Sequence, residues 1–310
     1  MLWEHQQKAI TIVKDCLFHE NSGRVLVAIP PGTGKTEIAV RAAVYWVNSK
    51  NHRKSLVCVP NTRILGQFYR RLVAVTGIPI AVEQADRIAN PAARIVLASQ
   101  PTLINRLAKF ETETLCLIDE AHHSNFNAPA FLSVLRGFER VVGLTATPWS
   151  PGCATLFGDS HRFFMSLSEA QRLNLASEFE ILPWSQPCGP FGLVFCESNR
   201  HSAEQSAKTP ASDWIGINRG EAHNLAAILR WQSRQIDVLF VNRMLLEGFD
   251  SKPCASVWID RSSHSDILLV QMVGRALRYQ PGKRARIYCA TAKTAQRVIT
   301  ALSRLELPMS

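Results

Sequence analysis

Several features of membrane, secreted and metal-stapled proteins are missing from this 310-residue sequence. No apolar run approaches the roughly 20 residues of a membrane-spanning helix, and residues 1–5 do not resemble a signal peptide. The eight cysteines occur singly, without a Cys-x-x-Cys pair, which argues against a zinc module or a disulfide framework. Periodic repeats and low-complexity tracts are also missing. We therefore expect a cytoplasmic protein with reduced thiols and no membrane partner.

Composition indicates a folded protein with two domains. Apolar residues make up 46% of the chain, which is enough for a sizeable core, and the length exceeds the roughly 250 residues that one core usually serves. The formal charge is +10, from 35 basic and 25 acidic residues. Such a charge favours a polyanionic partner, but it is equally compatible with a basic enzyme that has none.

One short stretch predicts a phosphate site. Residues 28–36 read Ala-Ile-Pro-Pro-Gly-Thr-Gly-Lys-Thr; they follow an apolar run and open an apolar-periodic segment. In a strand–loop–helix context, Gly32 and Gly34 allow backbone N–H groups to surround a phosphate, Lys35 can reach the outer phosphates, and the Thr36 hydroxyl can bind Mg²⁺. Ile29 stands where the strict pattern has glycine. The alternative is a glycine-rich turn before an ordinary helix.

A pair of carboxylates supports the phosphate site. The apolar run 115–118 ends in Asp119 and Glu120. In P-loop nucleotide hydrolases, the first carboxylate holds the Mg²⁺ shell and the second activates the attacking water. Such a pair is common at strand ends in any α/β protein, but together with the glycine loop it indicates an ATPase.

Strand and helix patterns alternate along both halves of the chain, which predicts an α/β fold with parallel sheets covered on both faces. The expected strands lie at residues 25–29, 55–59, 78–82, 94–98, 115–118 and 140–144, and then at 193–196, 214–217, 238–241, 257–259 and 287–290. From residue 149 to about 190 the alternation lapses among prolines and glycines. We expect a first domain at 1–165, a linker at 166–190 and a second domain at 191–310.

The ordered motifs resemble those of superfamily-two helicases over nearly the whole chain. Besides the glycine loop, the matching segments are Leu-x-x-His-Gln at 2–6, Asp-Glu-Ala-His at 119–122, Thr-Ala-Thr-Pro at 145–148, Leu-Val-Phe-Cys at 193–196, Glu-Gly-Phe-Asp at 247–250 and Gln-Met-Val-Gly-Arg-Ala-Leu-Arg at 271–278. The resemblance implies two RecA-like domains, with ATP and Mg²⁺ in a cleft between them.

The resemblance also implies a role for each matching residue. It implies catalytic roles for Lys35, Asp119, Glu120, Gln271, Arg275 and Arg278, with the two arginines acting as fingers. It implies nucleotide contacts by Gln6, Pro31, Gly32, Thr33, Gly34, Lys35, Thr36, Gly248 and Asp250, and Mg²⁺ ligation by Thr36 and Asp119. It implies nucleic-acid contacts by Asn61, Thr62, Arg63, Ser99, Thr102, Asn199 and Arg243, and coupling between sites by His122, Thr145 and Thr147.

The loops assigned to nucleic acid have a plain alternative, because the same residues are typical of helix-capping turns. The adjacent His122 and His123 point apart and have no third ligand at zinc spacing, so we expect no metal besides Mg²⁺.

The segments 247–250 and 271–278 (motifs five and six of the superfamily) resemble those of the group that contains restriction-type, UvsW-like and XPB-like enzymes, in a minimal two-domain form. That group favours DNA over RNA as the partner and a location wherever the nucleic acid is. No wedge, winged helix or zinc module is visible, so a protein partner could supply specificity. The alternatives are an RNA helicase and a catalytically silent scaffold that binds nucleic acid.

Overall fold

The computed structural model describes residues 2–18, 23–50, 53–90, 92–103, 106, 110, 114–123, 129–158, 161–242, 254–263 and 265–307. The side chains of Arg63, Ala130, Val134 and His161 are also outside the description. The chain forms two compact units, and the main division falls between Met165 and Ser166. None of the described helices is long and apolar enough to cross a membrane.

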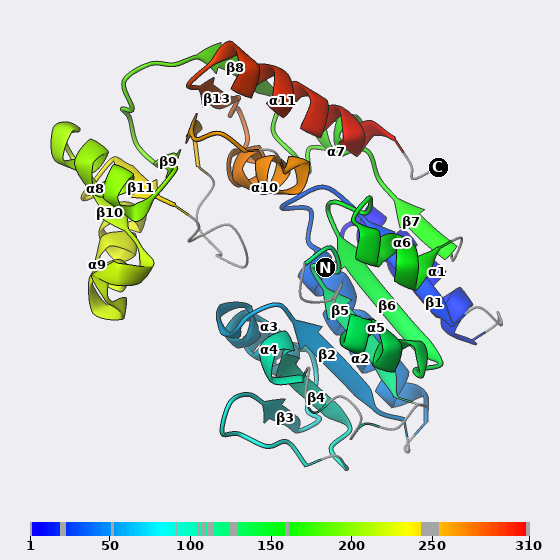
Figure 1. The fold of residues 1–310 in the computed structure, drawn as a ribbon. Coiled ribbons are helices and arrows are strands. Elements are labelled where there is room, and N and C mark those ends of the chain that lie inside the picture. Colours follow the sequence, from blue (N-terminus) through cyan, green and yellow to red (C-terminus); the bar gives the residue numbers. More distant parts are fainter. Residues whose placement is uncertain are drawn as a thin grey trace. The chain divides into compact units, whose positions relative to one another are not determined.

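The first domain is built on a seven-stranded sheet in which every paired neighbour runs parallel (Figure 1). Its order is β3-β4-β2-β5-β6-β1-β7. The strands are β1 (Arg24–Ala28), β2 (Ser55–Val59), β3 (Ile80–Glu83), β4 (Ile95–Ser99), β5 (Leu115–Asp119), β6 (Arg140–Thr145) and β7 (His161–Phe164). The central strands are short apolar runs buried on both faces, as a parallel sheet requires.

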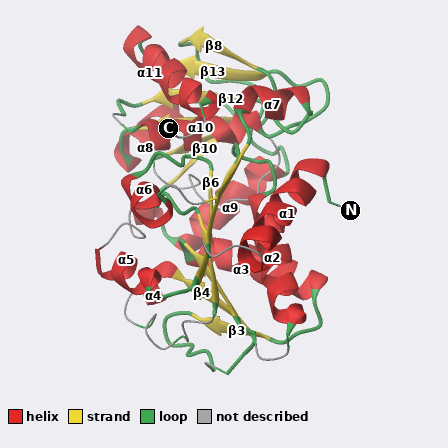
Figure 2. Cartoon of the chain, turned by 90° about the vertical axis from the view of Figure 1, so that its right-hand side faces the viewer, coloured by secondary structure: helices red, strands yellow, loops and turns green. Residues whose placement is uncertain are grey.

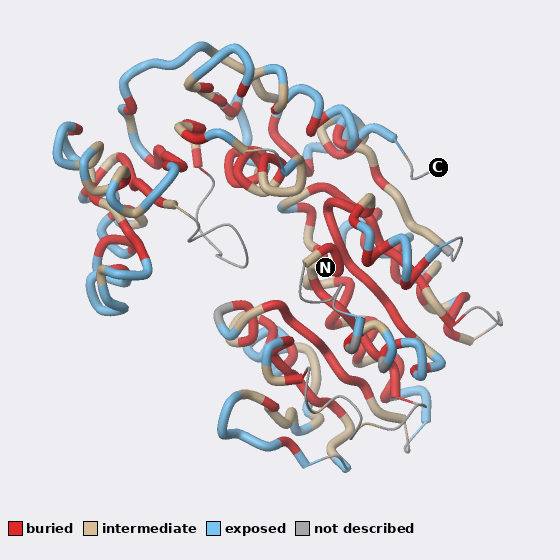
Figure 3. Tube along the Cα trace, in the orientation of Figure 1, coloured by how far each residue is buried: buried red, intermediate tan, exposed pale blue. Residues whose placement is uncertain are grey.

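Helices cover both faces of this sheet. They are α1 (Glu4–Phe18), α2 (Lys35–Ser49), α3 (Thr62–Val75), α4 (Gln100–Leu103), α5 (Pro129–Arg136) and α6 (Pro151–Phe157). Figure 2 shows the sheet nearly edge-on, with α1, α2 and α3 on one side and α4, α5 and α6 on the other. Phe131, Leu135 and Phe157 fill the layer under α5 and α6, and the sheet appears as a buried band in Figure 3.

The second domain has a six-stranded parallel sheet in the order β10-β11-β9-β12-β13-β8. The strands are β8 (Phe179–Pro183), β9 (Gly192–Cys196), β10 (Ser212–Ile215), β11 (Val238–Val241), β12 (Ser256–Asp260) and β13 (Ala285–Cys289). The helices are α7 (Leu167–Arg172), α8 (Asn199–Lys208), α9 (Glu221–Gln232), α10 (Asp266–Leu277) and α11 (Ala292–Ser303), with 3₁₀ turns η3 (Ile217–Arg219) and η4 (Arg304–Glu306).

The strand order of the second sheet reverses next to β9. From β9 the chain moves outward to β10 and β11 on one side, and then returns to β12 on the other side. In open parallel sheets, such a switch point leaves a crevice at the carboxyl ends of the two strands, where ligands usually bind.

The α/β class with two parallel sheets is confirmed. The stretch from 149 to 190 differs from the sequence expectation, because it contains α6, β7, α7 and β8. Strand β8 lies inside the expected linker 166–190 and pairs with β13, so this stretch contributes an edge strand to the second sheet. Strands β7 and β8 are edge strands with partly exposed residues, which weakens the apolar pattern that reveals central strands.

Candidate nucleotide and nucleic-acid sites

The glycine loop joins the carboxyl end of β1 to the start of α2. Gly32 and Gly34 have φ values of 84° and 90°, a region that residues with a side chain rarely adopt. Gly34 is the N-cap of α2, and a Cβ there would lie 2.3 Å from Nε2 of Gln6. The Thr33 hydroxyl donates a hydrogen bond of 2.7 Å to the carbonyl of Pro30 and closes the turn. The conformation of the loop therefore requires glycine at positions 32 and 34, where a side chain would be strained or would clash.

Lys35 is a buried cation with little compensation. Its residue is 9% exposed, and among the described residues its ammonium has one hydrogen bond, of 3.5 Å, to the carbonyl of Ile29. An ammonium has three donors, and burying it without an anion is unfavourable. The loop residues therefore fit an anionic phosphate, which would pair with Lys35 beside the N-terminus of α2. Thr36 lies in the first turn of that helix and is half-buried.

Gln6 links α1 to this loop. Its Nε2 donates to the carbonyl of Gly34 at 3.4 Å, and its Oε1 accepts from the backbone N–H of Trp3 at 3.0 Å. Gln6 is 5% exposed, whereas Trp3 is 51% exposed. The amide that was predicted to contact the nucleotide thus touches the loop, with an exposed aromatic residue beside it.

The carboxylates lie at the end of β5, two strands from β1 in the same sheet. Asp119 is the last residue of β5, and Glu120 follows with a φ of 50°. Two backbone bonds connect the three strand ends: Ala121 N–H to the carbonyl of Leu144 at 2.9 Å, and Ile29 N–H to that of Thr145 at 3.1 Å. The fold therefore brings the loop and the carboxylates to one edge of the sheet.

A polar network joins the carboxylate to β6. Nδ1 of His122 lies 2.8 Å from Oγ1 of Thr145 and 3.4 Å from Oε2 of Glu120. Oγ1 of Thr145 also accepts from the backbone N–H of Thr147 at 3.0 Å. The hydroxyl of Thr147 is buried and has no hydrogen-bond partner within the described part of the chain. Of the three residues predicted to couple the sites, His122 and Thr147 thus both contact Thr145, and His122 also lies beside Glu120.

The loops predicted to contact nucleic acid in this domain make local bonds. Oδ1 of Asn61 accepts from the backbone N–H of Ile64 at 3.2 Å at the start of α3. The hydroxyls of Ser99 and Thr102 are 3.0 Å apart, and that of Thr102 also accepts from the N–H of Ala85 at 3.1 Å. Thr62 is exposed, and the side chain of Arg63 lies outside the described part. The Asn61 bond has the geometry of a helix cap, whereas the Thr102 bond ties α4 to the turn at Ala85; the nucleic-acid contacts of these residues remain a prediction.

Sequence reasoning passed over Gln100, the first residue of α4. It is 1% exposed, and both polar atoms of its amide have no hydrogen-bond partner in the described structure. A buried amide without partners is costly and uncommon in folded proteins. Its position inside the predicted loop 99–102 was the available signal.

In the second domain, Gln271 and Arg275 lie one turn apart on α10, and Arg278 is the C-cap of that helix. Arg275 is 8% exposed. The Ser177 hydroxyl donates to the carbonyl of Arg278 at 3.1 Å, and the residue is bridged to Ala176. The helix end that carries both predicted fingers is thereby anchored to the segment before β8.

Lys283 is a second anchor of the same helix end, which the sequence did not indicate. Its ammonium donates to the carbonyls of Cys254 (3.2 Å), Ala276 (2.6 Å) and Arg278. Burial lowers the pKa of Lys283 to about 8.

The other predicted contacts of this domain are only partly described. Asn199 begins α8, and its side chain packs against Gly216, where a Cβ would lie 2.7 Å from its Cγ. Arg243 and the segment 247–250, including Gly248 and Asp250, lie outside the described residues.

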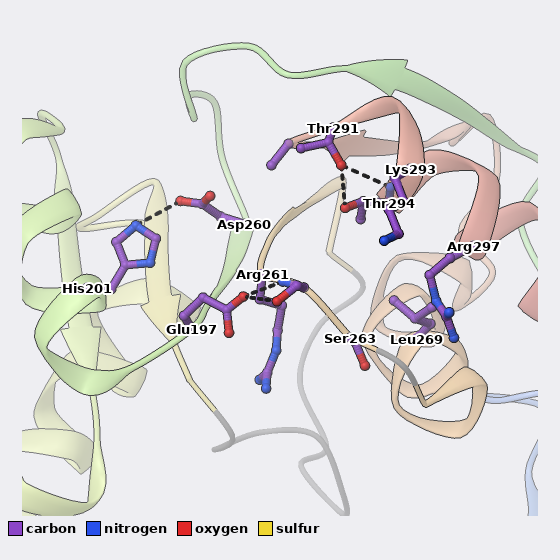
Figure 4. A pocket seen from close by; sticks show the side chains of 12 residues that line it. Glu197, His201, Asp260, Arg261, Ser263, Leu269, Thr291, Lys293, Thr294 and Arg297 are labelled. Atoms are coloured by element: carbon purple, nitrogen blue, oxygen red, sulfur yellow. Dashed lines mark hydrogen bonds and ion pairs between the residues drawn. The ribbon is translucent and has the colours of Figure 1, made fainter.

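A pocket of about 380 Å³ opens in the second domain, at the ends of β9, β12 and β13 (Figure 4). Glu197 accepts hydrogen bonds from the N–H and hydroxyl of Ser262, and Nε2 of His201 lies 3.1 Å from Oδ2 of Asp260. Burial raises the pKa of Asp260, although His201 opposes the shift. For Glu197, burial alone would raise the pKa, but the bonds from Ser262 reverse the direction and lower it.

Cys196, His201 and Asp260 gather ligand atoms beside this pocket, within 4.8 Å of one another. Ligand atoms around tetrahedral zinc lie roughly 3.3–3.8 Å apart. Within the part of the chain that the structure describes, no fourth His, Cys, Asp or Glu joins the group. We interpret the set as a His–Asp pair next to a buried thiol, whose pKa burial raises to about 12.

Comparison with known proteins gives the family context. Residues 1–150 match the family model of the res subunit of type III restriction enzymes. The chain is 29% identical over 160 residues to the ATP-dependent DNA helicase mph1 of Neurospora crassa, covering 45% of this chain and 13% of that protein. It is 30% identical over 136 residues to the transcription-repair-coupling factor of Escherichia coli, covering 40% of this chain and 12% of that protein. The chain thus spans about an eighth of these relatives.

Solved structures share the fold over almost the whole chain. The type ISP restriction-modification enzyme LlaBIII bound to DNA superposes with a TM-score of 0.76 at 15% identity, covering 99% of this chain and 30% of that one. A putative HsdR subunit of a type I restriction enzyme from Vibrio vulnificus gives 0.74 at 18%, covering 95% and 65%. Saccharomyces cerevisiae Dbp5 bound to RNA and ADP BeF3 gives 0.68 at 13%, covering 100% and 93%. The resemblance to superfamily-two helicases and the two RecA-like folds are confirmed.

Proposed function

Because the chain has the superfamily-two helicase architecture, we propose that it is an ATP-dependent nucleic-acid helicase or translocase that acts on DNA. The observation that carries this proposal is Lys35, a buried ammonium with one weak carbonyl bond, inside a loop whose glycines leave the backbone N–H groups bare. Lys35 would pair with the outer phosphates of ATP, and the loop N–H groups would hold the inner ones.

The neighbouring residues fit the remaining steps of hydrolysis. When bound, ATP supplies the phosphoryl group, and Thr36 and Asp119 are the residues that would hold its Mg²⁺. Glu120 would orient a water and accept its proton. The contact of His122 with both Glu120 and Thr145 gives this carboxylate a connection to the end of β6.

The second domain would complete the active site. We propose that Gln271, Arg275 and Arg278 contribute to it from α10 and its end, and that the two arginines stabilise charge on the transferring phosphoryl group. Hydrolysis would then be coupled to movement of the domains along a strand.

DNA is favoured because the curated relatives include a protein named as a DNA helicase, and because residues 1–150 match a restriction-enzyme family. The likeness to RNA-bound Dbp5 supports RNA as the second candidate. A scaffold without turnover is disfavoured, since Glu120, Arg275 and Arg278, the residues proposed to act in hydrolysis, are all present.

The test is phosphate release by the whole chain alone, with single-stranded DNA, with duplex DNA and with RNA of the same sequence. Hydrolysis that DNA stimulates several-fold more than RNA is the expected result. Greater stimulation by RNA would identify RNA as the substrate in place of DNA. The proposal of an ATP-driven helicase or translocase would still hold. Nucleotide binding without hydrolysis in any arm would identify a scaffold. The Glu120→Gln protein serves as the blank, since contaminating ATPases would survive that substitution.

A further inference from the structure

The pocket of the second domain lies where the topology of the sheet predicts a ligand. Glu197 follows β9, Asp260 and Arg261 end and follow β12, and both strands are parallel neighbours. This is the point where the strand order reverses, so the crevice between these two carboxyl ends is the switch point of the sheet. We call it the switch-point pocket; its volume of about 380 Å³ is within the range of small-molecule sites.

The charges of the switch-point pocket are separated into two walls. His201 and Asp260 lie on one side, and Lys293 and Arg297 on the other, with Arg261 between them (Figure 4). The carboxylates of the pocket already have partners, because Asp260 pairs with His201 and Glu197 accepts hydrogen bonds from Ser262. These carboxylates therefore do not require a cationic ligand.

The basic wall consists of lysine and arginine side chains. Arg297 pairs with Asp266, with 3.5 Å between Nη2 and Oδ1, and Arg261 donates to the carbonyl of Asn242 at 3.1 Å. The charge of Arg261 also helps to lower the pKa of Glu197. Lys293 is exposed and has no hydrogen bond or ion pair to another described residue.

Hydroxyl groups line the pocket next to these cations. Ser263, Thr291 and Thr294 contribute them, and the last two hydroxyls are 3.0 Å apart. Cationic side chains with hydroxyl donors are the combination that proteins use for phosphate oxygens.

From the position, the free lysine and the hydroxyl lining, we propose that the switch-point pocket binds a phosphate group through Lys293 and Arg261. The proposal rests on the proposed function in one respect, namely that a bound strand supplies the phosphate as a phosphodiester. A free phosphate compound carries the same chemistry, and the experiment separates the two sources.

The experiment measures how fast an amine-reactive reagent modifies Lys293 in the whole chain, by mass spectrometry. The probes are an oligothymidylate, the same amount of inorganic phosphate, and pyrophosphate. Lys208 is the matched control, because it is an exposed lysine of the same domain at the end of α8 and does not line the pocket. We expect the oligonucleotide to slow modification of Lys293 several-fold and to leave Lys208 unchanged.

The outcomes separate this inference from the proposed function. Protection by the oligonucleotide alone assigns the phosphodiester, and protection by inorganic phosphate or pyrophosphate alone assigns a small phosphate ligand. If Lys293 reacts as fast with every probe as without one, the proposal of phosphate binding in the pocket is wrong, whatever the ATPase assay shows. Protection of Lys293 without any ATP hydrolysis would support phosphate binding in the pocket and contradict the proposed helicase or translocase function.

A salt titration of oligonucleotide binding gives a second measurement. Each phosphate contact on a single strand contributes about 0.7 to the magnitude of the log–log slope. Lys293→Ala should lower the magnitude by about that amount, and Lys208→Ala should not. Identical slopes for the two variants would contradict a phosphodiester in the switch-point pocket.

Discussion

Replacing Lys283 by methionine tests how the second domain holds its arginines. The ammonium of Lys283 binds three carbonyls, two of which, from Ala276 and Arg278, belong to the end of α10. The last carbonyls of a helix have no partner within it, and a cation there is favourable. Methionine keeps much of the length of the side chain and removes all three donors, so the helix end loses this anchor.

The magnitude follows from the bonds lost. A hydrogen bond from a charged donor contributes about 1.5–3 kcal/mol, but Lys283 is partly exposed and its desolvation offsets much of three such bonds. We expect Lys283→Met to lower the free energy of unfolding of the second domain by about 1–3 kcal/mol. A shift of Arg278 by about 1 Å would cost on the order of 10²-fold in turnover. Binding of ATP should change much less.

The assays are urea denaturation and steady-state ATP hydrolysis, with Arg284→Met as the control, since Arg284 is an exposed cation one position away. The pH dependence adds a sharper criterion. Burial lowers the pKa of Lys283 from 10.5 to about 8. Between these pH values the unfolded chain holds a proton that the folded chain has released, so this group makes folding more favourable as pH rises.

Turnover should respond in the opposite direction, because the neutral amine above about pH 8 anchors the helix end less well. Lys283→Arg stays charged and should not show that loss. The neighbouring thiol of Cys254 does not produce the same profile, because burial raises its pKa to about 11. Unchanged turnover in Lys283→Met, or equal pH profiles for wild type and Lys283→Arg, would refute the reasoning.

Three further predictions concern other parts of the chain. Glu120→Gln should abolish turnover and leave ATP binding nearly intact, because the amide keeps the shape and cannot accept a proton; turnover within a few-fold of wild type would remove Glu120 from the mechanism. Arg275→Ala should lower turnover by roughly 10³-fold, the scale of losing an arginine finger, with a smaller loss of ATP affinity in an equilibrium titration. Gly143→Ala should destabilise the first domain by about 1–3 kcal/mol, since its Cβ would lie 2.4 Å from Cζ of Phe157. Gly77→Ala, with no atom within 4 Å of its Cβ, should stay within about 0.5 kcal/mol in the same urea titration.

Local features of the structure were predictable because their causes are local. The glycine loop follows from residue types at fixed spacing, and the Asp119–Glu120 pair lies at the end of β5, as the apolar run before it predicts. Strands buried on both faces, such as β2 and β11, carry continuous apolar runs and were also identified. In each case the sequence within about ten residues determines the conformation.

Edge strands β7 and β8 were missed for the converse reason. Their side chains are partly exposed, so their apolar pattern is weak, and pairing with β1 or β13 makes them strands. The roles of Asn61 and Thr102 also depend on contacts that the sequence does not show. Their residue types suit phosphate contacts as well as local bonds, and the fold places Asn61 at the start of α3 as a cap and brings Thr102 to Ala85, 17 positions away.

What the sequence determined by itself is therefore the class of fold, the order of motifs and the glycine loop, since each depends on periodicity or on short spacing. The tertiary structure decided which distant residues meet. Ser262 donates to Glu197 across 65 positions, and Lys283 reaches the carbonyl of Cys254 across 29. No periodicity records such contacts, because they depend on which strands become neighbours and where their carboxyl ends lie. The switch-point pocket and the anchor of α10 both arise in this way.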